Sequence, residues 1–298
     1  MSPENPFAGS YLDRRAEARL RDDWLAEALA DPGTRFLAML HSAALVRPAT
    51  QDTLARAVFL PNDDPRVAAH LNPEHLVLLG WFTGQRCVLV DLDPETATTD
   101  EGEAFSELRP LASELAAPEA ALLAYARALN IWRANHRFCG RCGAPTTAIR
   151  AGHSLLCTAC SFESFPRIDP AIIVLVHDGD RALLGRQSNW PPNRYSTIAG
   201  FVEPGEALED AVRREVDEET GIHVTSIEYH SSQPWPFPSS LMLGFQARGD
   251  YAEPTLHDGE LEDARWFTRD QLQAGAVLLP PAEAISRRLI DSWLSAVA

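Results

Sequence analysis

The spacing of apolar residues divides this chain into two parts with different patterns. In the first part, residues 16–29 carry apolar side chains at helical spacing, and residues 76–82 and 87–91 are apolar runs joined by a glycine-containing turn, as in a β-hairpin. Pro118 then opens an alanine- and leucine-rich segment that predicts a helix to about Asn135. These elements predict a small α+β domain over residues 1–135.

From residue 166 onward the pattern changes to short apolar strands. Residues 172–176 and 181–185 flank the turn Asp178-Gly179 and predict a hairpin. Further strands are predicted near Ile227 and over residues 241–247 and 264–267. A final helix places apolar residues on one side, at Ile285, Leu289, Ile290 and Trp293. We therefore predict a second α+β domain over residues 166–298.

An acidic helix is predicted between these strands. Glu215, Glu218 and Glu219 are spaced to fall on one helical face, where like charges repel and destabilise the helix. Hard divalent cations such as Mg²⁺ or Mn²⁺ relieve that repulsion, because they bind carboxylate oxygens and keep waters for a phosphate group. The opposite face is apolar, and Gly221 is placed to end the helix in the left-handed conformation. The alternative is an ordinary acidic helix whose charged face is solvated.

The stretch that contains this helix resembles the Nudix box of the Nudix hydrolases. The box positions are matched at Gly200, Glu206, Arg214, Glu215, Val216, Glu218, Glu219, Gly221 and Ile222. The resemblance implies hydrolysis of a nucleoside diphosphate linked to another group, and an α/β/α sandwich for the C-terminal domain. It also implies that Glu215 and Glu219 bind divalent metal, with Glu218 as a ligand or a helper. Glu206 is expected to brace Arg214.

A proline-rich motif follows the acidic helix. Prolines fix three backbone angles in the run Ser232-Gln233-Pro234-Trp235-Pro236-Phe237-Pro238-Ser239-Ser240. Trp235 and Phe237 are thereby presented for stacking on nicotinamide or adenine, and polar contacts are offered by Gln233, Ser239 and Ser240. The alternative is a packed loop whose tryptophan fills the core. The run resembles the motif of the NADH pyrophosphatase (NudC-type) branch of the Nudix enzymes, which implies NAD(H) as the substrate.

Further site residues are expected from the resemblance to this branch. The branch places a fourth metal-binding glutamate at Glu260, for which Glu262 and Asp263 are the alternatives. Ala199 is expected to offer its backbone carbonyl to the metal. Phe165 takes the position of an aromatic residue, commonly tyrosine, that touches the substrate, so stacking is retained while a phenol contact is lost. The branch also implies a homodimer.

Cysteines form the third motif, in two Cys-x-x-Cys pairs separated by fourteen residues: Cys139, Cys142, Cys157 and Cys160. Two such knuckles supply four thiolates for one tetrahedral zinc, and a site with four protein ligands is structural. A redox role for one pair is an alternative, and His136 or His153 is an alternative to one of the thiolates. We predict a zinc ribbon over residues 136–165, which the NudC-type branch also has.

Composition limits the compartments and partners that suit the chain. The 298 residues carry a formal net charge of −16, from 26 basic and 42 acidic residues, which opposes non-specific binding to nucleic acid. The first thirty residues hold no apolar leader, and no apolar run approaches membrane length. The fifth cysteine, Cys87, is expected to be a buried free thiol. We expect a cytoplasmic protein in a reducing compartment, with no membrane partner.

Together the motifs predict metal-dependent hydrolysis of NAD(H) to NMN(H) and AMP, with two or more Mg²⁺ or Mn²⁺ ions and one structural Zn²⁺ per chain. Metal-bound water is expected to attack one phosphorus in line, after Glu219 or Glu218 has oriented or deprotonated it. The same chemistry applies to an NAD cap on the 5′ end of RNA. The alternatives are a Nudix hydrolase of ADP-ribose or diadenosine polyphosphates, and a nucleic-acid binding protein that uses the zinc ribbon.

Overall fold

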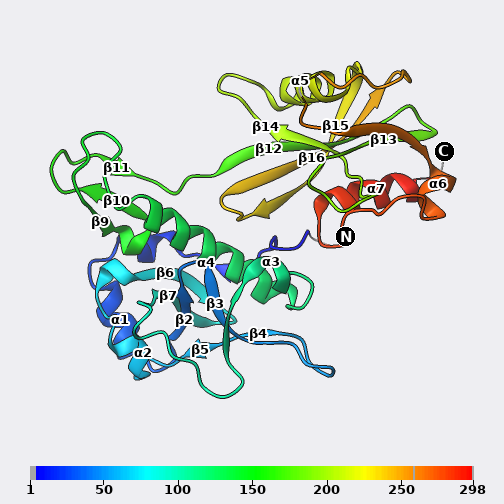
Figure 1. Cartoon of the computed structure of the whole chain (residues 1–298). Coiled ribbons are helices and arrows are strands. Elements are labelled where there is room, and N and C mark those ends of the chain that lie inside the picture. The colour runs from blue at the N-terminus through cyan, green and yellow to red at the C-terminus, as the bar shows by residue number, and fades with distance from the viewer. Residues whose placement is uncertain (1–4, 258, 297–298) are drawn as a thin grey trace. The chain divides into compact units, whose positions relative to one another are not determined.

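The computed structural model describes residues 5–257 and 259–296, and the chain divides into two units (Figure 1). The C-terminal unit comprises Ile168–Trp235, the residues from Ser240 onward, and Asn5 and Pro6 from the start of the chain. The N-terminal unit comprises Phe7–Arg167 together with Pro236–Ser239. Each unit therefore contains a short segment that is distant in sequence from the rest of it.

The N-terminal unit is built on an eight-stranded sheet. The bounds of its first elements are β1 Leu12–Asp13, a 3₁₀ helix Ala16–Leu20, α1 Trp24–Ala30, β2 Arg35–Leu40, β3 Ala43–Arg47, β4 Arg56–Ala57, β5 Phe59–Leu60, α2 Pro65–Ala68, a 3₁₀ helix Pro73–His75, β6 Leu76–Phe82, β7 Gln85–Asp91, β8 Ala104–Glu107, α3 Leu108–Leu111 and α4 Ala117–Asn135. The sheet order is β1-β6-β7-β2-β3-β4, with β5 paired to β2 and β8 paired to β3. The hairpin over β6 and β7 and the helix α4 confirm the sequence prediction.

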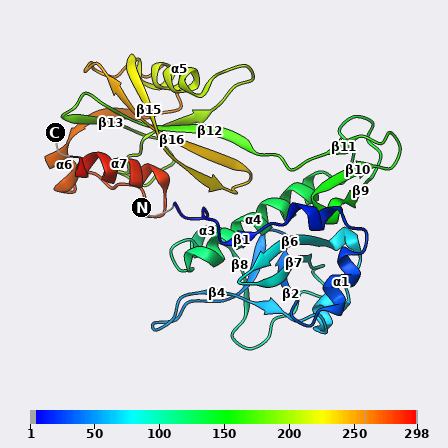
Figure 2. The ribbon, with the colours of Figure 1, turned by 180° about the vertical axis from the view of Figure 1, so that it is seen from behind.

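Both faces of this sheet are covered, because alternate strand residues point to opposite faces. Phe36 and Ala38 of β2 pack in one buried cluster with Trp24 and Ala28 of α1. Leu37, between Phe36 and Ala38, is also fully buried. The helix α4 runs along the sheet in both ribbon views (Figures 1 and 2).

The sequence pattern was wrong about the beginning of the chain. Residues 16–29 do not form one amphipathic helix but a 3₁₀ helix that ends at Leu20 and α1, which starts at Trp24. No strand was predicted for β2, β3 or β8, which supply much of the sheet. A short three-stranded sheet follows α4, with β9 Thr146–Ile149, a 3₁₀ helix Arg150–Gly152, β10 Ser154–Cys157 and β11 Glu163–Ser164, in the order β11-β10-β9.

The C-terminal unit is a six-stranded mixed sheet with helices on both faces (Figures 1 and 2). Its elements are β12 Asp169–His177, β13 Arg181–Arg186, β14 Ile198–Phe201, α5 Leu208–Thr220, β15 Val224–Trp235, β16 Ser240–Gly249, β17 Asp263–Thr268, α6 Arg269–Gln273 and α7 Ile285–Ser295. The strand order is β15-β16-β12-β13-β17, with β14 paired to β12, and only β12 and β16 among these pairs are parallel. The predicted hairpin, strands and final helix are confirmed.

Alternation along β12 explains why the two helices lie on opposite faces. Ile172, Val174 and Val176 belong to one buried cluster with α5, and Ile173 and Leu175 belong to another with α7. All five residues of this run are therefore apolar, and their side chains are divided between two cores. This three-layer arrangement is the α/β/α sandwich that the resemblance to the Nudix hydrolases implies.

The start of the chain is tied into the C-terminal unit by hydrogen bonds. The Asn5 side-chain amide donates to the Ser231 hydroxyl at 3.1 Å and to the Ser232 carbonyl at 2.7 Å. Arg288 of α7 donates to the Asn5 side-chain oxygen at 2.9 Å. These bonds join residues that are more than two hundred positions apart in sequence.

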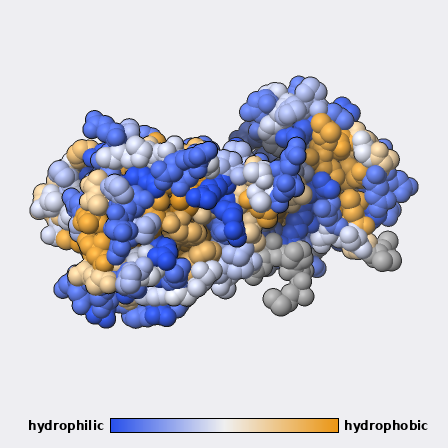
Figure 3. All heavy atoms as spheres, turned by 90° about the horizontal axis from the view of Figure 1, so that it is seen from below, coloured by the Kyte–Doolittle hydropathy of each residue, from blue (hydrophilic) through white to orange (hydrophobic). Residues whose placement is uncertain are grey.

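Many hydrophilic residues line the face shown in Figure 3, with hydrophobic areas among them. None of the helices in the described part of the chain is long and apolar enough to cross a membrane.

Candidate functional site

The acidic helix α5 is docked by its apolar side, which leaves Glu218 exposed and Glu215 half-buried. Ala211, Val212 and Val216 are fully buried against the sheet. Gly221 follows the helix with φ of 67°, and its N–H bonds to the Asp217 carbonyl at 2.7 Å, as predicted for a left-handed C-cap. The helix is thus fixed in rotation, with Glu215 and Glu218 on the side that faces the Gly200–Glu206 loop.

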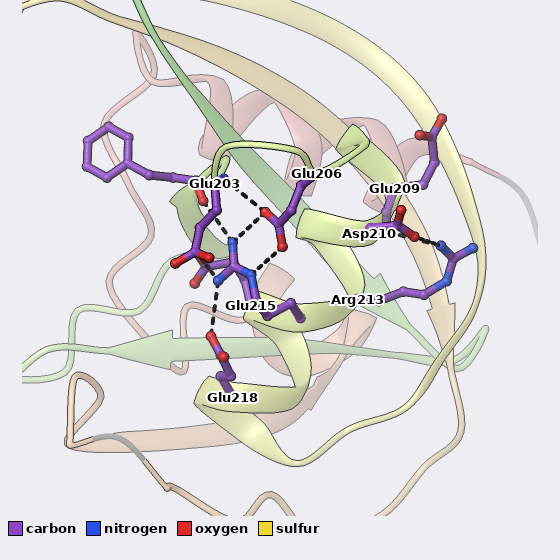
Figure 4. A network of polar contacts seen from close by, with 9 residues as sticks. Glu203, Glu206, Glu209, Asp210, Arg213, Glu215 and Glu218 are labelled. Carbon is purple, nitrogen blue, oxygen red and sulfur yellow. Dashed lines mark hydrogen bonds and ion pairs between the residues drawn. The ribbon is translucent and has the colours of Figure 1, made fainter.

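Arg214 ties this loop to the helix by hydrogen bonds. Its carboxylate partners Glu206, Glu215 and Glu218 are labelled in Figure 4. Its guanidinium donates to both Glu206 oxygens, at 2.6 and 2.9 Å, to the Phe201 carbonyl at 2.9 Å, and to Glu215 and Glu218 at 2.9 and 3.0 Å. The hydrogen bonds from Arg214 hold the pKa of the Glu206 carboxyl at about 2. The predicted bracing of Arg214 by Glu206 is therefore present, and Arg214 also partly neutralises two of the metal-binding candidates.

Gly200 of β14 gives Glu215 room to approach the sheet. A Cβ atom at this position would lie much closer than 3.0 Å to all three atoms of the Glu215 carboxyl group. Glu215 therefore packs directly over the backbone next to Ala199, whose carbonyl is the predicted backbone ligand. The backbone angle at Gly200 is one that alanine also adopts, so backbone conformation does not require glycine here. The close approach of the Glu215 carboxyl group does.

Negative charge is concentrated around Glu215. Burial raises the pKa of the Glu215 carboxyl, Arg214 lowers it, and the nearby carboxylates of Glu218 and Glu260 raise it again. Glu219 is 3% exposed, whereas Glu218 and Glu260 are exposed. Carboxylates that repel one another around a half-buried Glu215 fit one or more hard divalent cations, whose charge would relieve the repulsion.

The three candidates for a fourth metal-binding glutamate differ in their contacts. Glu262 forms an ion pair with Arg186, and Asp263 accepts hydrogen bonds from the Tyr195 hydroxyl and from Arg265. Glu260 is exposed, and its charge is among those that raise the pKa of Glu215. Glu260 stays the predicted fourth metal-binding glutamate.

The proline-rich motif is half strand and half loop. Residues 232–235 form the end of β15, where Gln233, Pro234 and Trp235 lie opposite Met242, Leu241 and Ser240 of β16. The rest of the run, Pro236–Ser239, connects β15 to β16. Proline is accommodated because β15 is an edge strand of the sheet.

Gln233 is fully buried and its amide is used within the unit. Its side-chain oxygen accepts the Ile285 N–H at 2.9 Å, and its side-chain nitrogen donates to the carbonyls of Glu283 and Pro6 at 2.8 and 3.3 Å. Trp235, two residues later, is partly exposed. Of the other predicted substrate contacts, Phe165 is 60% exposed, Pro238 is exposed, Pro236 is buried, and partial exposure is found for Pro234, Phe237, Ser239 and Ser240.

The four predicted zinc ligands come together. Their sulfur atoms all lie within 4.8 Å of one another: Cys139, Cys142, Cys157 and Cys160. Backbone N–H groups of Cys160 and Ala159 point at the Cys157 sulfur at 3.4 Å and lower the pKa of that thiol to about 6. A set of four thiol groups, one of them readily ionised, suits a tetrahedral zinc with no open position.

Histidines do not replace these thiols. His136 hydrogen-bonds the Trp132 carbonyl and His153 hydrogen-bonds the Leu78 carbonyl, and neither belongs to the cysteine group. Cys87 is buried, and burial raises the pKa of its thiol to about 12, as expected of an inert free cysteine.

A second group with metal-ligand atoms lies in the N-terminal unit and was not predicted. His70, His75 and Asp93 place one such atom each within 4.8 Å of the others. Both ring nitrogens of His70 have partners, however: Nδ1 bonds the Arg66 carbonyl at 2.9 Å and Nε2 lies 3.1 Å from the Asp93 N–H. His70 is thus a core histidine whose hydrogen bonds are satisfied.

Comparison with known proteins agrees with this site. Residues 167–293 match the NUDIX domain family, residues 134–165 match the NADH pyrophosphatase zinc ribbon domain, and residues 33–132 match the NADH pyrophosphatase-like rudimentary NUDIX domain. The NAD-capped RNA hydrolase NudC of Mycobacterium bovis (strain BCG / Pasteur 1173P2) is 41% identical over 292 residues, which cover 92% of this chain and 90% of that protein. The chain belongs to the NADH pyrophosphatase branch of the Nudix hydrolases. This Nudix hydrolase is also 33% identical to the NAD-capped RNA hydrolase NUDT12 of Homo sapiens, over 98% of this chain and 73% of that protein.

Proposed function

We propose that this Nudix hydrolase cleaves the diphosphate of NADH and NAD⁺ to give NMN(H) and AMP, and that it removes NAD caps from RNA. The observation that carries the proposal is the half-buried Glu215 carboxylate, on which the charges of Glu218 and Glu260 act, in a chain that matches all three domains of the branch. The curated relatives that match over most of the chain are named NAD-capped RNA hydrolases.

Two or more Mg²⁺ or Mn²⁺ ions are proposed to be held by the Ala199 carbonyl and by the carboxylates of Glu215, Glu218, Glu219 and Glu260. Bound there, such ions neutralise diphosphate oxygens and make water more acidic. The chain contributes the geometry: Arg214 holds the loop and the helix together, and Gly200 lets Glu215 reach the strand backbone. Glu219 or Glu218 orients the attacking water or accepts its proton.

Trp235 is the proposed stacking partner for the nicotinamide ring, and Phe165 is a second candidate. Trp235→Ala is expected to cost roughly 1–3 kcal/mol of binding to NADH, as for bases stacked on aromatic side chains. The loss should be much smaller for ADP-ribose, which lacks the second ring. Equal losses for both substrates would assign Trp235 to packing instead.

The deciding experiment compares turnover of NADH, ADP-ribose and a diadenosine polyphosphate by the purified protein with Mg²⁺ or Mn²⁺. We expect NADH to have the highest kcat/KM. Preference for ADP-ribose or diadenosine polyphosphate would support the alternative Nudix specificity. Strongly salt-dependent RNA binding without any turnover would support the alternative of a nucleic-acid binding protein.

A homodimer in the cytoplasm, with one structural zinc per chain, completes the proposal. The zinc is supported by the four clustered sulfur atoms. Sedimentation would test the dimer, and a monomer under assay conditions would remove any role for a partner subunit in substrate binding.

A further inference from the structure

A segment of the proline-rich motif is held by the N-terminal unit. Pro236–Ser239 belongs to this unit, although the strands on either side of it belong to the C-terminal unit. Arg127 of α4 donates a hydrogen bond to the Pro236 carbonyl, and its guanidinium carbon lies 4.8 Å from the centroid of the Phe237 ring. The Arg109 guanidinium carbon lies 5.3 Å from the same centroid, and Phe7 meets the ring edge to face at 6.0 Å.

Arg127 is buried where its charge costs free energy. The residue is 9% exposed, and its Nε atom is buried without a hydrogen-bond partner. Burial lowers the pKa of the guanidinium, and Glu107, at 3.4 Å, partly opposes this effect. A desolvated cation gains more from an aromatic face than an exposed one does, so the contacts with Pro236 and Phe237 offset part of this cost.

Trp235 lies between two anchored residues. Gln233, two positions before it, is fixed by hydrogen bonds to the Ile285 N–H and the Glu283 carbonyl. Pro236, directly after it, is fixed by Arg127. The backbone on either side of Trp235 is therefore held by buried groups, which limits the directions in which the indole can point.

We propose that Arg127 is a positioning residue for substrate binding, which holds Pro236 and Phe237 and so orients Trp235 for stacking. The inference rests on the proposed function of Trp235. Arg127 then packs against the face of the Phe237 ring, and of the two aromatic residues only Trp235 contacts the substrate.

Arg127→Met tests this proposal, because methionine fills the space of the stem without the guanidinium. We expect KM for NADH to rise by roughly 5- to 150-fold, the range that follows from loss of one stacked ring, with kcat nearly unchanged. KM for ADP-ribose should change much less. Phe237→Leu removes the same contact from the loop side and should reproduce the effect if Arg127→Met does not fold.

Arg66→Met is the matched control. Arg66 is another buried arginine of the N-terminal unit, at 8% exposure, and it pairs with Asp64 and Glu103 rather than with the motif. Its replacement should lower the stability of the unit while leaving KM for NADH near the wild-type value. An equal rise in KM for both arginine variants would overturn the proposal, because general loosening would then explain it.

A double-mutant cycle with Trp235→Ala shows whether Arg127 acts through Trp235. In the Trp235→Ala background, Arg127→Met should add almost nothing to KM for NADH. Independent, additive effects would contradict the proposal. Phe237→Leu is tested in the same Trp235→Ala background. If Phe237 only holds Trp235 in place, Phe237→Leu should add almost nothing to KM for NADH there. If Phe237 contacts the substrate itself, its replacement should still raise KM in that background.

A readout without turnover separates this inference from the proposed activity. Trp235 emission is obtained as the difference between each protein and its Trp235→Phe counterpart. In Arg127→Met this emission should become more accessible to acrylamide quenching, and in Arg66→Met it should not. Unchanged acrylamide quenching of Trp235 in Arg127→Met would refute the positioning role of Arg127. Failure of the wild-type protein to hydrolyse NADH would refute only the proposed function.

Discussion

Gly200→Ala should inactivate the enzyme while leaving its fold intact. The backbone angle at Gly200 is one that alanine adopts freely, so the substitution brings no conformational strain. The new Cβ would lie far inside 3.0 Å of the Glu215 carboxyl group, so that group must move away from the strand. The carboxylate is the end of a flexible side chain, so the movement costs little stability.

The catalytic cost is larger, because the displaced group is a metal-binding candidate. A shift of about 1 Å in a catalytic constellation costs on the order of a hundredfold in rate. We therefore expect kcat/KM for NADH to fall about a hundredfold or more in Gly200→Ala, with the thermal midpoint within about 3 °C of wild type, as for a change below about 1 kcal/mol.

The assay is NADH hydrolysis at saturating Mg²⁺ alongside thermal unfolding followed by circular dichroism. Gly140→Ala is a suitable control, since a Cβ there meets nothing within 4 Å and the residue lies in the ribbon. Near-normal turnover by Gly200→Ala would refute the argument that Glu215 must sit against the strand. Loss of activity together with a collapse in stability would show that the glycine serves folding instead.

Three further changes test other parts of the structure. Glu219→Gln keeps the size of the side chain but removes its charge, so NADH hydrolysis should fall at least roughly a hundredfold; a variant with near-normal kcat would disprove the role of this carboxylate. Cys142→Ser should release the zinc and lower the thermal midpoint, and metal analysis of the native protein should find about one zinc per chain; equal stability without zinc would contradict a structural role. Burial lowers the pKa of His153 from 6.5 to about 4, so the folded state disfavours its protonation. The stability that the neutral His153 contributes is complete above pH 6.5 and is lost as the pH falls toward 4. His153→Gln should therefore reduce the drop in the urea unfolding midpoint between these two pH values. An unchanged drop would mean that other groups cause it.

Local chemistry made the acidic helix and the cysteine group predictable. The helix can be predicted from the spacing of Glu215, Glu218 and Glu219, from its apolar stripe and from Gly221, because all of these lie within one stretch of sequence. The cysteine knuckles likewise lie close in sequence, and their sulfur atoms come together. By contrast, β2 and β3 pair with each other around His41 and Ser42, which are not the turn residues that mark a hairpin in a sequence. β8 pairs with β3 from far along the chain, so no local pattern predicts that pairing.

The proline-rich motif shows where local pattern is insufficient. Pro234 reads as a strand breaker, but the edge position of β15 removes that objection. The fully buried amide of Gln233 has its partners at Pro6, Glu283 and Ile285, and the contacts of Phe237 come from Phe7, Arg109 and Arg127. Only the three-dimensional arrangement brings these residues together, so sequence alone gave no reason to separate Trp235 from Phe237.

The tie between Asn5 and the C-terminal unit has a consequence for the order of events during synthesis. Asn5 is synthesised before Ser231, Ser232 and Arg288, each of which follows it by more than two hundred residues. The native fold of the C-terminal unit is therefore completed only after Arg288 has been synthesised, and these contacts join residues far apart in the sequence. We expect these bonds to form only after translation has passed Arg288, when most of the N-terminal unit is already available to fold.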